Sequence, residues 1–505
     1  MRLNRDEYRS KVLGCWLGKN IGGTLGAPFE WHRQVNNVSF YTQELGGEPL
    51  PNDDLDIQLL WLVALEEKGI ELNSHILGDY WCLYVTPHWC EYGTGKINMR
   101  QGLLPPLSGS LHNEFKNSCG AFIRAEIWAC ICPGRPDVAA RYAFEDAILD
   151  HGDGEGTYAE VFIAALEAAA FVVGDIRKLI EIGLSFIPAD CGVAGAALTA
   201  VECYDAGKTW LEARDEILRR HRGGTFWNMP ELTSPADTEK GFAEGKLAYD
   251  VPSNIGMTVL GLLYGNGDFD ATMCITVNCG EDTDCTGATA GSIFGILGGA
   301  ESIPERWIEP IGRRIKTACL NLGELGYFGN QLPQDVDNMT DRTERIAKQV
   351  MLRHGGPDIE SAEPTDLSDA NPEALKARDG GAFLYRAMNG PRFDFPFFTV
   401  AVDYGDTPAI RPEEPKAVRL VIHSEYKVQA NLSVHWYLPE GWTITPGADV
   451  FALSLPRMLC SQPVTLAFEV TCPVITRSVQ RAAVEISIEG RPTVMMVPIT
   501  FLNGT

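Results

Sequence analysis

Three acidic residues, Glu281, Asp282 and Asp284, stand within four positions, and the chain then turns apolar and small. Carboxylates crowded in this way repel one another, so a buried cluster of them usually holds a cation. Their oxygens suit hard ions such as Mg²⁺ or Mn²⁺. The alternative is an acidic cap on an ordinary core helix, because the helix dipole favours negative charge at an N-terminus.

A second acidic run precedes another helical pattern. Asn52, Asp53 and Asp54 stand directly before an apolar stretch with helical spacing that stops at Gly69, and glycine commonly ends helices. Further oxygen-bearing side chains are therefore expected at a helix N-terminus. Two such N-termini could converge on a hard cation, although sequence spacing does not show that they meet.

The helix expected after Asp284 is rich in glycine. Gly287, Gly291 and Gly295 recur at intervals of four, so they share one helix face. Each glycine costs about 1 kcal/mol relative to alanine inside a helix, so their presence predicts close approach of another backbone. We expect a buried central helix here, and residues 8–23 predict a first helix with a small-residue face of its own.

Three short motifs occur in order along the chain. Residues 22–30 read G-G-T-L-G-A-P-F-E, residues 52–55 read N-D-D-L, and residues 280–291 read G-E-D-T-D-C-T-G-A-T-A-G. They resemble the motifs G-D-x-x-G-x-x-x-E, T-D-D-T and G-G-D-T-D-T-x-G-A-x-A-G of the ADP-ribosylglycohydrolase family. The resemblance runs from about Tyr8 to Trp307, and it implies an all-α fold that hydrolyses a bond at the anomeric carbon of a ribose.

The resemblance also implies a metal site and a set of catalytic residues. One or two ions, Mg²⁺ or Mn²⁺, are expected at this site. The metal ligands carried over from the motifs are Asn52, Asp53, Asp54, Asp282 and Asp284. The catalytic residues carried over are Glu30, Asp54 and Asp284.

The chain departs from the family motifs at three positions. Gly23 stands where the family has Asp, and Asn52 and Cys285 stand where it has Thr. The amide oxygen of Asn52 can still bind a metal, whereas the sulfur of Cys285 is soft and a poor ligand for Mg²⁺. Thr286 lies about 100° further round the helix, so whether it substitutes for the missing threonine stays open.

Two further segments resemble substrate-binding parts of the family. Residues 117–124 are similar to G-N-G-A-x-x-R, and the glycine-rich loop at 150–156 aligns with a segment that carries a histidine. The substrate-binding residues implied are Asn117, Gly120, Arg124, His151, Gly152 and Gly154. Arg124 could serve in an ion pair or in a phosphate contact, and the loop could face a ligand or cap a helix. The aromatic residues Trp81, Trp89 and Tyr92 either line a sugar or base pocket or pack in the core.

The pattern along the chain predicts a multidomain protein. Residues 1–355 read as an all-α catalytic domain, and residues 356–380 are polar and proline-containing, as in a linker. Residues 381–505 alternate with a period of two, which predicts a β-sandwich. This domain resembles the immunoglobulin-like accessory domains of carbohydrate enzymes, and it could bind carbohydrate, act as a spacer or form a dimer surface.

The composition argues against some classes of partner. The chain has 505 residues and a net charge of −25, which disfavours nucleic acid and anionic membranes because both are negatively charged. It contains no run of about 20 apolar residues that would suggest a membrane span, and its start has no apolar signal region. The 14 cysteines show no zinc-type pairs, which predicts reduced thiols in a cytoplasmic protein. Homo-oligomerisation stays open.

Three functions follow from these patterns. The first is a metal-dependent glycosyl hydrolase that cleaves a ribosyl bond, typically one to ADP-ribose, on a protein or a small molecule. The second is a hydrolase of another furanosyl or N-glycosyl bond in a small glycoside or nucleoside, and the altered ligands motivate it. The third is an inactive binding or structural homologue, which the departures at Gly23, Asn52 and Cys285 would allow.

Overall fold

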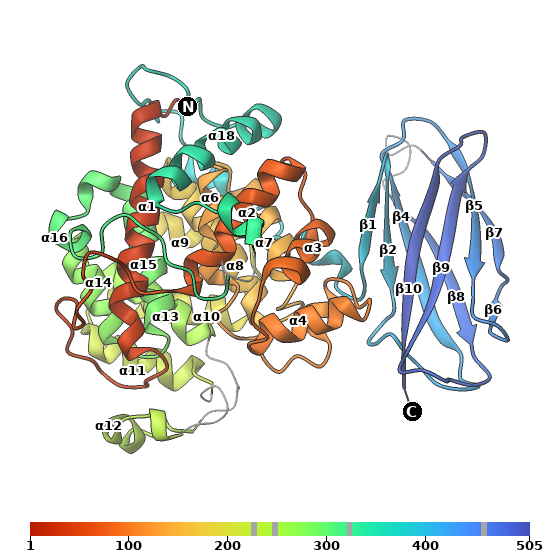
Figure 1. Cartoon of the computed structure of the whole chain (residues 1–505), viewed down its shortest axis with the longest axis horizontal. Helices are drawn as coiled ribbons and strands as arrows, with labels where there is room; N and C mark the ends of the chain where they lie inside the picture. Colours follow the sequence, from red (N-terminus) through yellow and green to blue (C-terminus); the bar gives the residue numbers. More distant parts are fainter. Residues whose placement is uncertain (224–229, 245–250, 321–325, 456–461, 505) are drawn as a thin grey trace. The chain divides into compact units, whose positions relative to one another are not determined.

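The computed structural model describes residues 1–223, 230–244, 251–320, 326–455 and 462–504. These residues form two compact units, which are coloured along the chain in Figure 1. The first comprises Met1–Lys96 and His112–Leu384, and the second comprises Ile97–Leu111 and Tyr385–Thr505. Helices dominate the first unit and strands the second. The predicted fold class, a helical domain followed by a sandwich of strands, is confirmed.

The described α-helices all precede the strands in sequence. They are α1 (Arg5–Gly26), α2 (Asp53–Lys68), α3 (Ser74–Tyr84), α4 (Cys90–Arg100), α5 (Leu107–Ser110), α6 (Glu126–Cys130), α7 (Pro136–Ala147), α8 (Glu155–Ala170), α9 (Ile176–Leu184), α10 (Gly192–Asp205), α11 (Trp210–His221), α12 (Pro235–Glu239), α13 (Val251–Tyr264), α14 (Phe269–Asn278), α15 (Thr283–Gly298), α16 (Glu305–Ile308), α18 (Val336–His354) and α19 (Pro372–Leu375).

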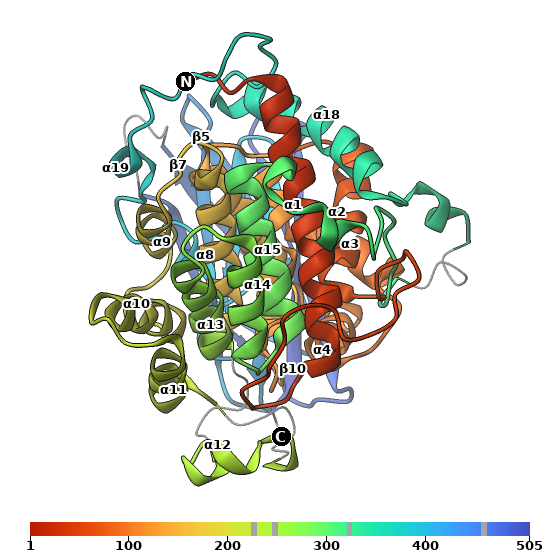
Figure 2. The ribbon, with the colours of Figure 1, turned by 90° about the vertical axis from the view of Figure 1, so that its left-hand side faces the viewer.

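Helices α1 and α15 run antiparallel and lie side by side in the helical unit (Figure 2). Glycines make their contact, because a Cβ atom added to any of them would clash with the backbone of the opposite helix. The facing pairs are Gly14 with Gly295, Gly18 with Gly291 and Gly22 with Gly287. The two small-residue faces predicted from the sequence therefore meet, and the close backbone approach is confirmed.

This helix pair aligns two helix ends that the site requires. The last residue of α1, Gly26, accepts a hydrogen bond of 2.8 Å from the hydroxyl of Thr283 in the first turn of α15. A short helical turn then leads the chain from Gly26 to Glu30. Asp282, which directly precedes α15, donates its backbone N–H to the Asn254 side chain on α13. The start of α15 is thus held from two sides.

Helix α2 begins and ends where the sequence predicts. Asn52 is its N-cap, and its side-chain oxygen accepts from the backbone N–H of Asp54 at 2.7 Å. The apolar residues from Leu55 to Leu65 are buried in the helical unit. Gly69 ends the helix with a positive φ of 82°, a conformation that glycine adopts without strain.

Residues 356–380, which the sequence predicts as a linker, lie against the helical unit. The backbone N–H of Leu3 donates to the carbonyl oxygen of Asp358, and that of Arg2 donates to the carbonyl oxygen of Asp366, both at 2.9 Å. Further along, Lys376 pairs with Glu181 of α9 at 2.8 Å. The first unit accordingly extends to Leu384.

The second unit is a sandwich of two five-stranded sheets, with orders β1-β2-β4-β8-β6 and β3-β10-β9-β5-β7. Neighbouring strands are antiparallel except for the β10–β3 pair. Alternate residues such as Val418, Leu420 and Ile422 point into the core, as the period of two predicts. The strands are β1 (Arg392–Phe395), β2 (Phe398–Asp403), β3 (Ala409–Ile410), β4 (Lys416–Ser424), β5 (Ala430–Tyr437), β6 (Thr443–Thr445), β7 (Asp449–Ser454), β8 (Val464–Thr471), β9 (Val479–Ile488) and β10 (Val494–Asn503).

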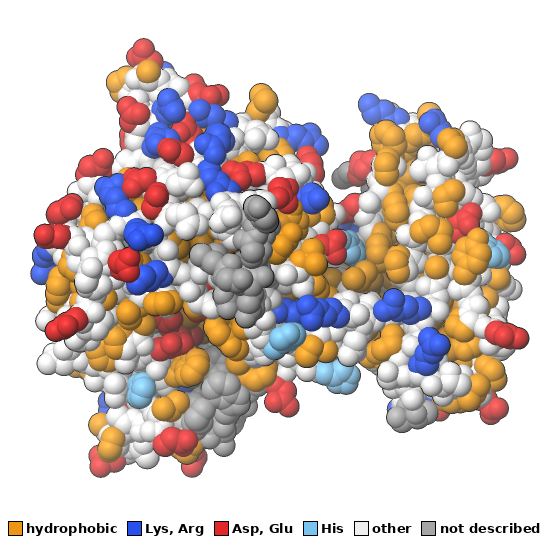
Figure 3. All heavy atoms as spheres, in the orientation of Figure 1, with side chains coloured by type: hydrophobic (Ala, Val, Ile, Leu, Met, Phe, Trp, Pro, Cys, Tyr) orange, Lys and Arg blue, Asp and Glu red, His pale blue; other side chains and the backbone are white. Residues whose placement is uncertain are grey.

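The surface gives limited information about partners. On the face drawn in Figure 3, the Asp and Glu side chains of the helical unit are scattered among Lys and Arg. In the sandwich, Phe451 and Leu453 on the edge strand β7 expose 80% and 50% of their surface. Among the described helices, none combines the length and the apolar character that crossing a membrane requires.

The glycine contact between α1 and α15 makes a first prediction. In Gly18→Ala, the new Cβ would clash with the Gly291 carbonyl, and neither backbone can yield without moving its helix. We expect the free energy of unfolding to fall by about 1–3 kcal/mol, measured by chemical denaturation. Gly174→Ala is the matched control, because no atom lies within 4 Å of its added Cβ. Equal stability of the two variants would contradict the packing described here.

Candidate active site

A cavity of about 560 Å³ opens in the helical unit. Acidic and aromatic side chains dominate its lining. Its described lining residues are Ala27, Glu30, Trp31, Pro51, Asn52, Asp53, His88, Trp89, Cys90, Glu91, Tyr92, Cys119, Gly120, Ile123, Asp282, Asp284, Cys285 and Ala318. Both acidic runs singled out in the sequence therefore reach the same cavity.

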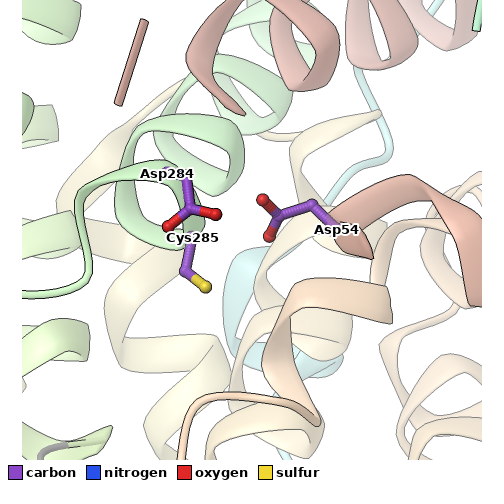
Figure 4. A group of neighbouring side chains, drawn as sticks. All are labelled: Asp54, Asp284 and Cys285. Atoms are coloured by element: carbon purple, nitrogen blue, oxygen red, sulfur yellow. The ribbon is translucent and has the colours of Figure 1, made fainter. Parts of the chain in front are cut away.

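Carboxylates from two helix N-termini meet at this cavity. Figure 4 shows Asp54, from the first turn of α2, directed towards Asp284 and Cys285, from the first turn of α15. One ligand atom from each of these three residues lies within 4.8 Å of the others. Glu30, Asp282 and Asp284 form a second group with the same limit. Asp284 is common to both groups, so the two predicted clusters form one site.

Several oxygens of this site lack the hydrogen bonds that buried carboxylates normally make. Both oxygens of Asp54 and one each of Asp282 and Asp284 have no hydrogen-bond partner among the described residues. The nearest cation, Lys19, lies 3.8 Å from Asp54 and donates instead to Glu126 at 2.7 Å. Such burial costs free energy unless a positive charge compensates it. The set of hard oxygen donors therefore suits a divalent cation.

Burial and mutual repulsion shift the acid–base behaviour of these groups. Burial, reinforced by the charges of Asp282, Asp53 and Asp54, raises the pKa of Glu30 to about 9. Burial also raises the pKa of Asp54 to about 8, although Lys19 opposes this shift. The pKa of Asp284 is likewise raised well above its ordinary value, first by burial and then by neighbouring carboxylates. Without a cation, the site favours protonated carboxyl groups.

Cys285 takes a place in the carboxylate cluster that the family fills with threonine. It is buried, and burial raises the pKa of its thiol well above the ordinary value. A protonated thiol is a poor ligand for a hard cation. The alternative, Thr286, directs its hydroxyl to the backbone oxygen of Thr283 at 3.4 Å and does not line the cavity.

The other two departures from the family motifs lie against each other. A Cβ atom at Gly23 would clash with the amide nitrogen of Asn52, and it would lie 3.6 Å from an oxygen of Asp54. Glycine at position 23 thus makes the space that the Asn52 side chain occupies. Because the Asn52 oxygen already caps α2, any bond from it to a metal would use its second lone pair.

Two of the predicted substrate-binding residues lie one behind the other. Gly120 lines the cavity, and its carbonyl oxygen accepts from the Arg124 guanidinium at 2.8 Å. Arg124 itself is fully buried and pairs with Asp146 at 2.9 Å and with Asp150 at 2.7 Å. Of the two roles left open for Arg124, the structure shows the ion pair.

The other four predicted substrate-binding residues support the cavity wall from behind. His151 is buried and bonds to Asp150 at 2.8 Å and to the Ser118 hydroxyl at 3.1 Å. The Asn117 side chain accepts from the backbone N–H of Glu155 at the start of α8. Gly152 has a positive φ of 49°, and a Cβ atom at Gly154 would clash with the backbone oxygen of Lys116. The structure does not bring these four residues to the described lining of the cavity.

Two carboxylates near the site were not singled out from the sequence. Glu91 lines the cavity while only 6% exposed, and burial raises the pKa of its carboxyl to about 7. Asp56 is buried beneath the site, and one of its oxygens accepts from the backbone N–H groups of Ala318, Cys319 and Leu320. Only the position of Asp56, two residues after Asp54, could have drawn attention to it.

Aromatic side chains form much of the remaining wall. Tyr92 is buried and donates its hydroxyl to Asp53 at 3.4 Å, whereas Trp89 is 48% exposed at the cavity. Trp81 is core, and the Arg124 guanidinium lies 4.8 Å from the centre of its ring. Trp31 also lines the cavity, and no motif or spacing in the sequence points to it.

Together, the helical fold and the acidic cavity define an all-α protein unit with a site suited to a cation. A family model for the ADP-ribosylglycohydrolases matches residues 4–342, and the chain belongs to that family. A comparison with curated proteins finds no match. Family membership indicates a glycosyl hydrolase that acts on ribosyl substrates, and such enzymes typically depend on a metal.

The contact between Gly23 and Asn52 gives a prediction about metal binding. In Gly23→Ala, the new Cβ would displace the Asn52 amide and disturb the first turn of α2. We expect several-fold weaker Mg²⁺ affinity by calorimetry. Affinity is the better readout, because alanine raises helix propensity by about 1 kcal/mol and offsets a loss of stability.

A double-mutant cycle tests whether this effect passes through Asn52. Adding Gly23→Ala to an Asn52→Ala background should change the Mg²⁺ affinity little, because the displaced side chain is already absent. Additive losses from the two substitutions would show that position 23 acts by another route.

The raised pKa values predict how pH affects stability. The folded pKa values of about 8 for Asp54 and about 9 for Glu30 exceed their ordinary values, so the folded form binds more protons between pH 4 and 9. The metal-free protein should therefore lose stability as pH rises through this range. Because a divalent cation replaces those protons, stabilisation by Mg²⁺ should grow with pH.

Thermal unfolding at pH 5, 7 and 9, with chelator or with Mg²⁺, measures this effect. At 100 times the dissociation constant, bound Mg²⁺ should stabilise by about 2.7 kcal/mol. Asp54→Asn should flatten the pH dependence of the metal-free protein. If Mg²⁺ raised the stability by the same amount at all three pH values, the assignment of these carboxylates to the metal would be contradicted.

Proposed function

We propose that this chain is a metal-dependent glycohydrolase that cleaves the bond at the anomeric carbon of a ribosyl group. Within the family, ADP-ribosyl linkages on a protein or a small molecule are the first candidates for its substrate. A bond from another furanosyl group, in a small glycoside or nucleoside, is the second. The single observation that carries the proposal is the meeting of Asp54, Asp282 and Asp284 with several oxygens unpartnered among the described residues.

The proposed metal ligands are the carboxylates of the two helix N-termini. Asp53, Asp54, Asp282 and Asp284 would hold one or two ions, Mg²⁺ or Mn²⁺, with Asn52 as a weaker ligand. A cation bound there would orient the ribose hydroxyls and polarise an oxygen at the reacting centre. An inert homologue would have no reason to retain unpartnered buried carboxylates, which lower stability.

The protein's own groups would then act on the sugar and on water. Glu30, beside Asp282 and Asp284, would position the attacking water and take its proton. Asp54 and Asp284 would stabilise positive charge that develops on the sugar ring. Gly120 would contact the substrate, while Arg124 and His151 would hold the wall that carries it.

The double substitution Asp282→Ala plus Asp284→Ala tests this site. We expect turnover to fall by at least about 10²-fold and Mg²⁺ binding to disappear in calorimetry, because two of the converging carboxylates are removed. Turnover would be followed with a panel of ADP-ribosylated and simple ribosyl substrates.

The fold should survive this change, since the contact between α1 and α15 is made by glycines and backbone atoms and not by these two side chains, and circular dichroism should still report the helices. Asp79→Ala, a change at an exposed position of α3, is the matched control and should retain full turnover. Unchanged turnover in the double variant would refute the site assignment.

A further inference from the structure

The cavity is acidic well beyond what a metal site needs. Five of its lining residues are carboxylic acids, and none of the described lining residues is Lys or Arg. If all five acids were ionised, two divalent cations would not neutralise them. The five acids are Glu30, Asp53, Glu91, Asp282 and Asp284.

The buried cations around the cavity are already paired with other acids. Lys19 donates to Glu126 at 2.7 Å, and Arg124 pairs with Asp150 at 2.7 Å. The N-terminus of α2 is occupied as well, because the side-chain oxygen of Asn52 accepts a hydrogen bond from the backbone N–H of Asp54 in its first turn. Phosphate groups are normally bound by Arg, Lys or open helix N-termini. Among its described lining residues the cavity thus offers a diphosphate no Arg or Lys side chain, which leaves only the start of α15 and a bound cation to stabilise one.

Glu91 supplies a hydrogen-bond acceptor that points to a ligand. It is only 6% exposed, it lines the cavity, and its Oε2 has no hydrogen-bond partner among the described residues. The other oxygen packs so tightly on Gly120 that a Cβ there would clash with it. The carboxylate is therefore fixed in place with one buried oxygen that has no partner among the described residues. A ligand hydroxyl is the group that would satisfy it without adding negative charge.

Two tryptophans lie where the cavity meets solvent. Trp31 and Trp89 both line it and are 41% and 48% exposed. Trp31 has a φ of 65°, a strained backbone conformation for a bulky residue. The next residue, His32, holds this turn, because its carbonyl accepts from the backbone N–H of Glu281 at 2.9 Å. Strain retained beside a cavity is typical of functional positions, and indole rings offer flat apolar surfaces for stacking.

We infer that the cavity takes an uncharged pentofuranoside, with a sugar hydroxyl donating to Glu91 and an apolar face stacked on Trp31 or Trp89, instead of a diphosphate-bearing nucleotide sugar. This inference rests on the proposed function, because it names the substrate class of the same site. It favours the second candidate substrate, a small neutral glycoside. Glu91 then acts as a specificity residue that favours hydroxyl donors and repels phosphate.

Calorimetry of the full-length protein with Mg²⁺ tests the substrate class. The probes are the two anomers of 4-nitrophenyl D-ribofuranoside, which are uncharged, and ADP-ribose. We expect one ribofuranoside anomer to bind at least tenfold more tightly than ADP-ribose. Tighter binding of ADP-ribose, or binding of none of the three probes, would overturn the inference.

Two variants with matched controls locate the binding groups. Glu91→Gln should weaken ribofuranoside binding about tenfold, since one acceptor oxygen becomes a donor, and Trp89→Ala should weaken it by a similar factor. The controls are Glu114→Gln and Leu83→Ala, exposed positions outside the lining, and both should bind as the unchanged protein does. Wild-type affinity in Glu91→Gln would remove Glu91 from the proposal.

Release of 4-nitrophenol from the same samples reports the proposed function separately. Binding with release supports both the substrate class and the hydrolase activity. Binding without release would uphold the inference about the ligand and contradict the proposed hydrolysis. Hydrolysis of ADP-ribosylated substrates together with tighter ADP-ribose binding would uphold the proposed hydrolysis and contradict the inference about the ligand.

Discussion

The contact between α1 and α15 is the constraint on which the site depends. Because glycines face each other along both helices, the two backbones touch directly, and no side chain separates them. The helices run antiparallel, so the end of α1 lies beside the start of α15 and the two are joined by a hydrogen bond from Thr283 to Gly26. Glu30 follows one end and Asp284 opens the other. A wider helix spacing would separate the carboxylates that now share a cavity.

A shell of ion pairs surrounds this arrangement, while several carboxylate oxygens at the site have no hydrogen-bond partner among the described residues. Behind the wall, Arg124 joins Asp146 and Asp150 in full burial, and Lys19 joins Glu126. Removing one member of a buried pair costs about 3–5 kcal/mol, because the other charge is left uncompensated. The paired groups therefore fix positions, whereas the unpartnered oxygens around Asp54 retain the capacity to bind. The carboxylates that hold the wall in place are thus different residues from those with oxygens left to bind a ligand.

The sequence predicted features that depend on local spacing and missed those that depend on distant partners. Glycines at intervals of four and acids at two helix starts predicted the helix contact and the cluster, because both patterns follow from helix geometry. Arg124 and His151 could not be placed, since their orientation depends on Asp146, Asp150 and Ser118. Glu91 and Trp31 belong to no recurring motif, and only the folded chain brings them to the cavity.

The acidic cluster has two halves that share Asp284 and differ in their donor atoms. Asp284 joins Glu30 and Asp282 in a group that offers only carboxylate oxygens, and it joins Asp54 in a group that includes the Cys285 sulfur. Because burial raises the pKa of that thiol well above its ordinary value and sulfur is a soft donor, the all-oxygen group suits a hard cation better. Gly23 leaves room for Asn52 beside Asp54, so the changes at all three positions fall in the sulfur-containing half. The group that the three departures leave unchanged is therefore the all-oxygen one, whose donors suit a hard cation.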